Sequence, residues 1–186
     1  MASTSSYPVI DLFAGPGGLG EGFSRLTGGN GQRVFKVRLS VEMDKTAHQT
    51  LLLRKFFHCF RTVPADYDDY IRGKISRAEL FARYPNQYLA AAREAWRAEL
   101  GKVSDRAVSR RINQALNGAP LWALVGGPPC QAYSLVGRSR MQSRTNPNFE
   151  NDHRHFLYKE YLRIVARHRP PVFLMENVKG LLSATH

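Results

Sequence analysis

The chain has 186 residues, of which 43% are hydrophobic, and it carries a formal net charge of +12 with a sequence pI of 10.2. This length suits one globular domain with a core and is too short to promise two. No stretch approaches the roughly 18 apolar residues of a membrane span, and the polar start is unlike a secretory leader, so we expect a cytoplasmic protein with no membrane partner. The two cysteines, Cys59 and Cys130, have no CxxC spacing, which argues against a disulfide framework or a structural zinc site and leaves at least one thiol free for chemistry.

The positive charge favours a polyanionic partner, because basic side chains that neutralise phosphates release condensed counterions. The charge alone fits a nucleic-acid-binding protein and a merely soluble basic domain about equally well. Arg138, Arg140 and Arg144 lie in one polar stretch with no acidic residue between them. That stretch is typical of a loop that faces phosphates.

The first part of the chain predicts strand, helix, strand and helix in that order. Residues 8–13, PVIDLF, indicate a buried strand that runs into the glycine-rich turn AGPGGLGEGF and a helix start. Residues 34–42 predict a second strand, and Asp44 is expected to cap the helix formed by KTAHQTLLLRKFF. From about residue 61 to 118 the sequence is charged and alanine-rich with apolar residues at helical spacing, which predicts a helical insertion.

The remainder continues the alternation. Residues 121–125, LWALV, predict a strand that ends at the turn GGPPC, and a polar loop to about residue 153 precedes the amphipathic helix HFLYKEYLRIVARH. Pro170 and Pro171 end that helix, and residues 172–176, VFLME, predict another strand. Alternating helices and continuously apolar strands indicate an α/β fold with a doubly wound, mostly parallel sheet.

Ligands in such folds bind beyond the carboxyl ends of the strands. The glycine turn at 14–20 lies there, and so does Glu42, which is 24 residues beyond Gly18 at the end of the second strand. Glycine lets backbone approach a ligand closely, and an acidic side chain at this place can accept hydrogen bonds from ribose hydroxyls. Together they indicate an adenosine-containing cofactor; the alternative is a tight strand-to-helix turn with no ligand. GPGG followed by LG departs from the GxGxxG dinucleotide spacing and slightly favours S-adenosyl-L-methionine.

Cys130 and Glu176 also follow strand ends. The turn GGPP would hold the Cys130 thiol at the rim of the cleft, although a buried structural cysteine is the default alternative. Glu176 alone could be a solvated strand end or a helix-capping carboxylate. As a pair, they suit a thiol nucleophile opposite a carboxyl proton donor.

Four segments in this order, IDLFAGPGGLGEGF, VEMDKTA, GGPPCQAYS and FLMENVKGLLS, resemble the leading motifs of the DNA cytosine-5 methyltransferase family over nearly the whole chain. The resemblance implies a Rossmann-like, S-adenosyl-L-methionine-dependent DNA (cytosine-5-)-methyltransferase acting on double-stranded DNA. It implies that Cys130 adds to C6 of a flipped cytosine while Glu176 hydrogen-bonds N3 and the exocyclic amine. C5 then takes the methyl group, and loss of the C5 proton, with water as a candidate base, expels the cysteine.

The resemblance also implies a cofactor site without a metal, made by Phe13, Ala14, Gly15, Gly17, Gly18, Glu42, Met43, Pro128 and Leu157. Met43 stands where the family often has tryptophan, so the adenine would rest on a thioether. The acidic residue expected near the end of the third strand has three candidates, Asp66, Asp68 and Asp69, and the sequence does not choose among them.

Residues 131–152 resemble the family's mobile loop that closes over DNA, with the arginines suited to phosphates; an ordinary solvated loop is the alternative. The candidate nucleic-acid contacts are Gln131, Ser134, Arg138 and Arg140.

The family's usual chain continues well past residue 186, so we expect a sheet truncated before its last strands and a final strand with an unpaired, apolar edge. The partner that completes it is then a missing C-terminal half or a complementing chain. A cytosine-5 methyltransferase for RNA and a noncatalytic half that needs a second segment stay open as alternatives. Restriction-modification in a bacterial or phage-infected cell is the commonest role that the resemblance suggests.

Overall fold

The computed structural model describes residues 6–129 and 157–176. Its strands form one sheet in the spatial order β3-β2-β1-β4-β5, and every neighbouring pair is parallel. The strands are β1 (Tyr7–Leu12), β2 (Phe35–Glu42), β3 (Ala95–Arg97), β4 (Ala123–Gly126) and β5 (Val172–Met175). The helices are α1 (Gly18–Arg25), α2 (Lys45–His58), α3 (Ala65–Ile71), α4 (Arg77–Arg83), α5 (Pro85–Glu94), α6 (Asp105–Leu116) and α8 (Leu157–His168).

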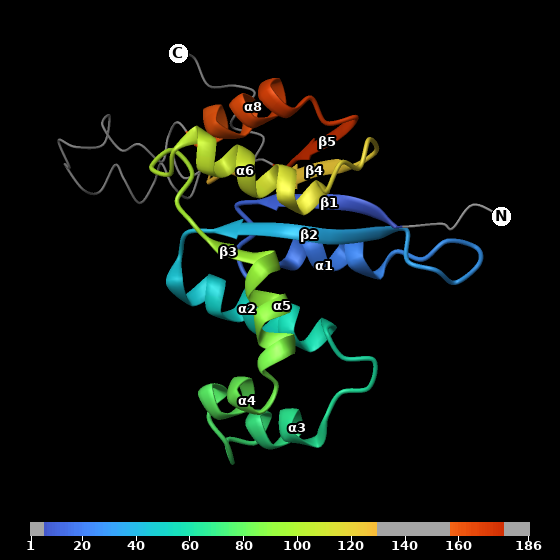
Figure 1. Ribbon diagram of the computed structural model, residues 1–186, viewed down its shortest axis with the longest axis vertical. Helices are drawn as coiled ribbons and strands as arrows, with labels where there is room; N and C mark the ends of the chain where they lie inside the picture. Colours follow the sequence, from blue (N-terminus) through green and yellow to red (C-terminus); the bar gives the residue numbers. More distant parts are fainter. Residues whose placement is uncertain (1–5, 130–156, 177–186) are drawn as a thin grey trace, which may run out of the picture.

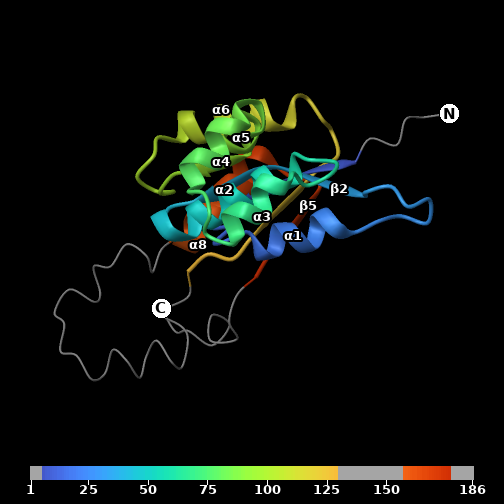
Figure 2. The same ribbon diagram turned by 90° about the horizontal axis from the view of Figure 1, so that it is seen from below.

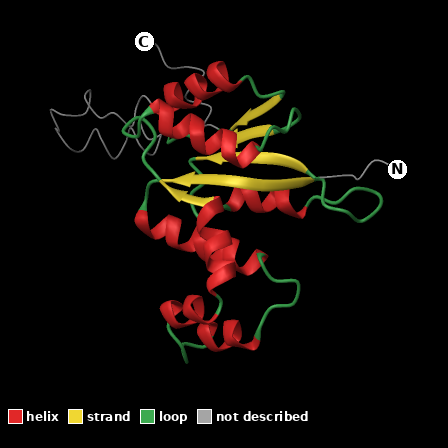
Figure 3. Ribbon diagram, viewed as in Figure 1, coloured by secondary structure: helices red, strands yellow, loops and turns green. Residues whose placement is uncertain are grey.

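Helices cover both faces of the sheet. Figure 1 shows α6 and α8 on one side and α1, α2 and α5 on the other, and Figure 2 gives the same arrangement from below. In Figure 3 the yellow sheet therefore lies between two red layers. This three-layer arrangement confirms the doubly wound, parallel α/β sheet that the sequence predicts.

Strand β1 supplies the core on both faces, which explains its continuous apolar sequence. Ile10 and Leu12 pack with Val108 and Ile112 of α6 and with the α8 side chains, whereas Val9 faces the layer that contains α1. Because successive side chains of a strand point to opposite faces, a central strand covered on both sides must be apolar throughout. Asp11 is the exception, and it is fully buried.

The start of α2 is as predicted. The Asp44 side chain accepts a hydrogen bond from the Ala47 backbone N–H at 2.7 Å, which satisfies one of the free donors of the first helical turn. The capped helix begins at Lys45, directly after the end of β2.

Residues 61–118, expected as a helical insertion, contain four helices and also the short strand β3. Its three residues pair in parallel with Ser40, Val41 and Glu42 at the edge of the sheet. Helix α6 then packs on the sheet face as part of the α6 and α8 layer, and α5 contacts β2 and β3, so the segment that departs from the sheet is α3 and α4. A strand of only Ala-Trp-Arg after an alanine-rich helix carries no period-2 pattern, and its pairing with β2 is what makes it a strand.

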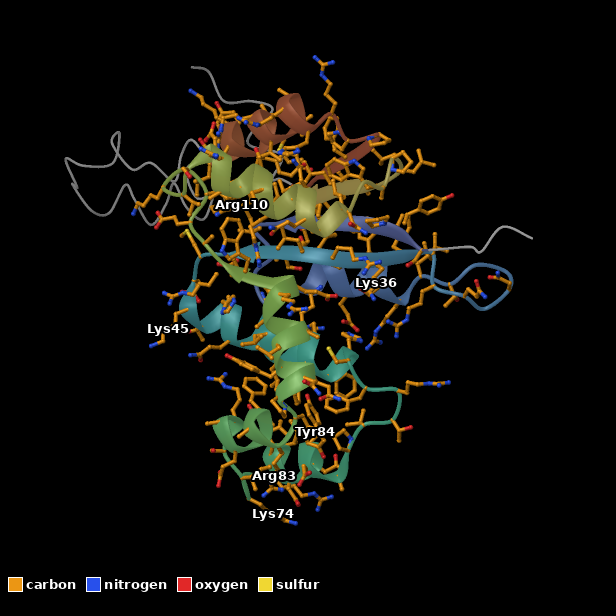
Figure 4. The ribbon with its side chains drawn as sticks, viewed as in Figure 1. Lys36, Lys45, Lys74, Arg83, Tyr84 and Arg110 are labelled. Carbon is orange, nitrogen blue, oxygen red and sulfur yellow. The ribbon has the colours of Figure 1, made fainter. Side chains whose placement is uncertain are left out.

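Helices α3 and α4 form a lobe beyond α2, at the bottom of Figure 1. An aromatic cluster joins the lobe to Phe56 of α2, and it includes Phe60, Tyr67, Tyr70, Phe81, Tyr84 and Tyr88. Figure 4 labels Arg83 and Tyr84 in this lobe. The Tyr84 hydroxyl donates to Asp66 Oδ2 at 2.6 Å, and Arg83 forms an ion pair with the same carboxylate, so the contacts tie α4 to α3.

Strand β5 lies at the edge of the sheet within the described residues. Val172, Phe173 and Leu174 are 61%, 52% and 46% exposed, although all three are apolar. This exposure agrees with the expected apolar edge at the final strand. None of the helices in the described part of the chain has the length and apolar character needed to cross a bilayer.

Candidate functional site

The glycine turn at the carboxyl end of β1 has an unusual backbone. Phe13 has φ +55°, and Gly15 and Gly17 have φ +56° and +90°. A left-handed conformation at a residue other than glycine costs of order 1 kcal/mol, and such strain gathers where backbone geometry serves a ligand. Gly17 is needed for a second reason, since a Cβ there would lie 2.9 Å from Leu51 Cδ1 of α2. The turn is thus held in one shape by its own chain and by α2.

Glu42 fixes this turn to the end of β2. Its Oε2 accepts from the Gly15 N–H at 2.7 Å, its Oε1 accepts from the Asp44 N–H at 2.6 Å, and the residue is only 9% exposed. Each carboxylate oxygen has a second lone pair, so these two bonds leave acceptors for the hydroxyls of a ribose. The structure therefore joins Gly15 and Glu42, as the cofactor prediction requires.

Open space lies beside the turn. A Cβ built on Gly15 or Gly18 would meet no atom within 4 Å, so the described chain leaves open space above both glycines. Phe13 and Met43 are half-buried at the ends of β1 and β2, and Ala14 is buried. Pro128, which follows β4, and Leu157, the first residue of α8, are also buried.

Glu176 lies against the turn that follows β4. Its backbone N–H donates to the Gly126 carbonyl at 2.8 Å, and a Cβ built on Gly127 would lie 3.6 Å from its Oε2. The carboxyl group therefore lies next to Gly127, near the start of GGPPC, the turn that leads to Cys130. Cys130, Gln131, Ser134, Arg138 and Arg140 themselves lie outside the described residues.

The three aspartates considered for the third strand lie elsewhere. Asp66, Asp68 and Asp69 belong to α3, in the lobe, whereas β3 ends at Arg97. Asp66 is held by Tyr84 and Arg83, whose hydrogen bonds lower the pKa of its carboxyl group, and Asp69 accepts from Lys74 Nζ at 2.8 Å. None of the three is at the carboxyl edge of the sheet.

The acidic residue that follows β3 is Glu99, which sequence reasoning did not consider. The Ala98 N–H donates to the Glu42 carbonyl at 3.1 Å, which brings this segment beside the end of β2. The Glu99 carboxylate forms an ion pair with Lys102 at 3.0 Å. The signal that would have found it is the parallel pairing of residues 95–97 with β2, which no local pattern shows.

A charged cluster lies behind the turn, on the α1 and α2 side. Burial raises the pKa of Asp11 to about 7; Lys55 opposes this rise and Glu42 adds to it. Glu21 of α1 accepts from His58 of α2 at 2.7 Å, and Arg54 Nε donates to the Pro16 carbonyl at 3.2 Å. These contacts dock α2 onto the turn. Within the described ranges, no three His, Cys, Asp or Glu side chains gather as metal ligands would.

Comparison with known proteins relates the chain to one protein family. Residues 88–186 match the family model described as C-5 cytosine-specific DNA methylase. The chain is 35% identical over 196 residues to the type II methyltransferase M.Bpa9945I of Bacillus paralicheniformis, an alignment that covers 95% of the chain and 41% of the relative. It is 29% identical over 178 residues to the type II methyltransferase M1.HphI of Haemophilus parahaemolyticus, covering 96% and 34%.

A third relative is the DNA-cytosine methyltransferase of Escherichia coli strain K12, which is 30% identical over 180 residues, covering 96% of the chain and 31% of the relative. The chain thus spans less than half the length of each of these relatives.

Proposed function

Because the chain belongs to the C-5 cytosine-specific DNA methylase family, we propose that it forms the cofactor-binding and nucleophile-bearing part of an enzyme that methylates C5 of cytosine in double-stranded DNA. The observation that carries the proposal is the convergence at one sheet edge of the Gly15–Glu42 contact and of Glu176 beside the turn that leads to Cys130. Relatives named type II methyltransferases support a role in restriction-modification.

S-adenosyl-L-methionine is the proposed methyl donor and supplies an electrophilic methyl group when bound. Open space above Gly15 and Gly18 supports this proposal, and so does Glu42, whose carboxylate can accept hydrogen bonds from ribose hydroxyls. Phe13, Ala14, Gly17, Met43, Pro128 and Leu157 complete the proposed pocket. Glu99, which follows the neighbouring strand β3, is a further candidate for its adenine end.

In the proposed reaction the target cytosine is flipped out of the duplex, because its ring carbons are not reachable within the stack. The Cys130 thiolate forms a bond to C6, and Glu176 donates a hydrogen bond to N3, which stabilises the negative charge that develops on the ring. The electron pair then available at C5 takes the methyl group. Water removes the C5 proton, the C6–S bond breaks, and the thiolate returns. Gln131, Ser134, Arg138 and Arg140 are the proposed DNA contacts.

The test uses the full-length protein with tritiated S-adenosyl-L-methionine and a duplex that contains 5-fluorocytosine. Fluorine at C5 cannot leave as a proton does, so the enzyme is trapped as a covalent, labelled adduct. We expect an adduct with DNA that Cys130→Ser abolishes. A parallel arm with transfer RNA that contains 5-fluorocytosine tests the alternative substrate, and labelling of RNA alone would exclude DNA as the substrate.

A second test addresses the cofactor site. Glu42→Gln keeps one carbonyl acceptor but replaces the other oxygen by an amide that donates, so one of the Gly15 and Asp44 N–H groups loses its partner. We expect S-adenosyl-L-methionine to bind the variant at least about tenfold more weakly, because the amide also removes a charged acceptor proposed for a ribose hydroxyl, and a charge-assisted hydrogen bond is worth about 1.5–3 kcal/mol. Equilibrium dialysis measures this. Glu79→Gln, which alters only the capping box of α4, is the control.

A further inference from the structure

Two neighbouring strands carry the groups proposed for catalysis. Cys130 follows the last residue of β4 by four positions, and Glu176 follows the last residue of β5 directly. The strands are in register at Gly126 and Met175, and the Glu176 N–H donates to the Gly126 carbonyl at 2.8 Å. The separation of these two strand ends therefore bears on the proposed reaction, in which the thiol and the carboxyl group act on one substrate.

Tyr161 of α8 lies directly beneath this pair of strand ends. Its hydroxyl is 3.1 Å from the Leu124 carbonyl oxygen of β4 and 3.0 Å from the Leu174 carbonyl oxygen of β5. One donor proton is thus shared between two strands. The residue is fully buried, and burial together with the nearby Asp11 charge raises its pKa, so the phenol stays protonated and keeps its donor at any working pH.

The tyrosine is itself held in place. Its ring edge presses on Gly126, where a built Cβ would lie 3.2 Å from Tyr161 Cε2. Arg163, two residues further along α8, forms ion pairs with Asp105 of α6 and with Glu160. The ion pair with Asp105 connects α8 to α6, and the Tyr161 hydroxyl connects α8 to the sheet.

We infer that Tyr161 is a positioning residue for the proposed methyl transfer, in which its hydroxyl sets the separation of the β4 and β5 ends that carry Cys130 and Glu176. The inference rests on the proposed function. One carbonyl acceptor would be enough to satisfy the hydroxyl. This hydroxyl reaches one carbonyl on each strand: Leu124, two residues before the end of β4, and Leu174, two residues before Glu176. Catalytic groups must be held to within about 0.5 Å of the productive geometry, so a small splay of the strands is enough to slow the reaction.

The test is Tyr161→Phe in the full-length protein, which removes the hydroxyl and keeps the ring against Gly126. Three quantities are measured: kcat, the KM for S-adenosyl-L-methionine, and the single-turnover rate of adduct formation on duplex DNA that contains 5-fluorocytosine. We expect kcat and the adduct rate per folded molecule to fall about tenfold together, as geometric misplacement predicts. The KM for the methyl donor should stay within about twofold, because the glycine turn and Glu42 lie at β1 and β2.

Ile164→Val is the matched control. Ile164 lies on the same helix in the same buried cluster, and the change destabilises the core without touching either carbonyl. It should leave kcat per folded molecule unchanged. If Tyr161→Phe folds poorly, all three proteins are compared in trimethylamine N-oxide, which favours the folded state.

Three results would each overturn the inference and leave a purely structural role. The first is a wild-type kcat per folded molecule in Tyr161→Phe, and the second is an equal loss of kcat in Ile164→Val. The third is a Tyr161→Phe chain that folds under neither condition. These results leave the proposed function intact as long as wild-type protein forms the adduct. If wild-type protein forms no adduct on DNA, the proposed function fails, and the inference fails with it.

Discussion

Replacing Gly126 with alanine should destabilise the sheet directly beneath the candidate site. A Cβ at this position would lie 2.3 Å from the Leu12 carbonyl oxygen, 3.1 Å from the Leu12 carbonyl carbon and 3.2 Å from Tyr161 Cε2. Two of these atoms are backbone of the neighbouring strand β1, so relief requires β1 and β4 to move apart. Overpacking typically costs about 1–3 kcal/mol, and a clash with rigid backbone belongs at or above the upper end.

Urea unfolding followed by circular dichroism measures this cost. With a denaturant slope of about 2 kcal/mol per molar, a loss of 3 kcal/mol lowers the midpoint by about 1.5 M. Gly22→Ala is the matched control, because Gly22 is exposed on α1 and a Cβ there meets no atom within 4 Å. That change should stabilise the helix by up to about 1 kcal/mol. A Gly126→Ala midpoint equal to or above that of wild type would refute the close approach of β1 and β4.

Two further predictions concern α1 and α2. Asp44→Ala should cost about 1 kcal/mol of unfolding free energy, because the Ala47 N–H loses its cap, while Asp44→Ser should restore most of it in the same urea assay. For Glu21, burial would raise the pKa, but hydrogen bonds from His58 and Arg25 outweigh it and lower the pKa to about 2. The stabilisation by Glu21 is therefore present above its ordinary pKa of 4.5 and is lost as pH falls toward 2. Urea midpoints should be higher for wild type than for Glu21→Gln at pH 6, and the difference should shrink by about half or more at pH 3, partway between the two pKa values.

The elements that the sequence predicts well are those whose pattern is local. The first strand, the glycine turn and the Asp44 cap each depend on neighbours within a few positions, and all three occur as expected. The amphipathic helix before Pro170 is also local, and α8 ends two residues before that proline.

What the sequence does not reveal is set by contacts between distant residues. Strand β3 has only three residues and exists because it pairs with Ser40 to Glu42, more than fifty positions earlier. A reader of the sequence who does not know of β3 cannot place Glu99 after a strand. The three aspartates of the lobe then remain as candidates for the acidic residue at the end of the third strand. The reach of the Tyr161 hydroxyl to two strands is equally invisible, since helical periodicity shows only that Tyr161 faces the core.

The buried carboxyl group of Asp11, next to the candidate site, lowers the stability of the fold when it is charged. The carboxylate is fully buried behind the glycine turn, and neither oxygen has a partner of good hydrogen-bond geometry within the described part of the chain. Gly20 is required there, since a Cβ would lie 2.8 Å from Asp11 Oδ2. Because burial raises its pKa from 3.8 to about 7, the folded protein binds this proton more tightly than the unfolded chain does. Stability should therefore fall as pH rises from about 4 to 7, by at most about 4 kcal/mol.

Asp11→Asn removes the titration, so its free energy of unfolding relative to wild type should increase over the same pH range. Urea midpoints at pH 5, 6, 7 and 8 measure the difference, and Asp44→Asn, an exposed cap at which asparagine serves equally well, is the control. Parallel pH profiles for wild type and Asp11→Asn would contradict the burial argument. A rising difference would mean that the chain keeps a destabilising carboxylate behind its glycine turn. Loss of S-adenosyl-L-methionine binding in Asp11→Asn would then give a reason, because Asp11 attracts Lys55 and lies against Gly20 of α1, next to the proposed cofactor turn.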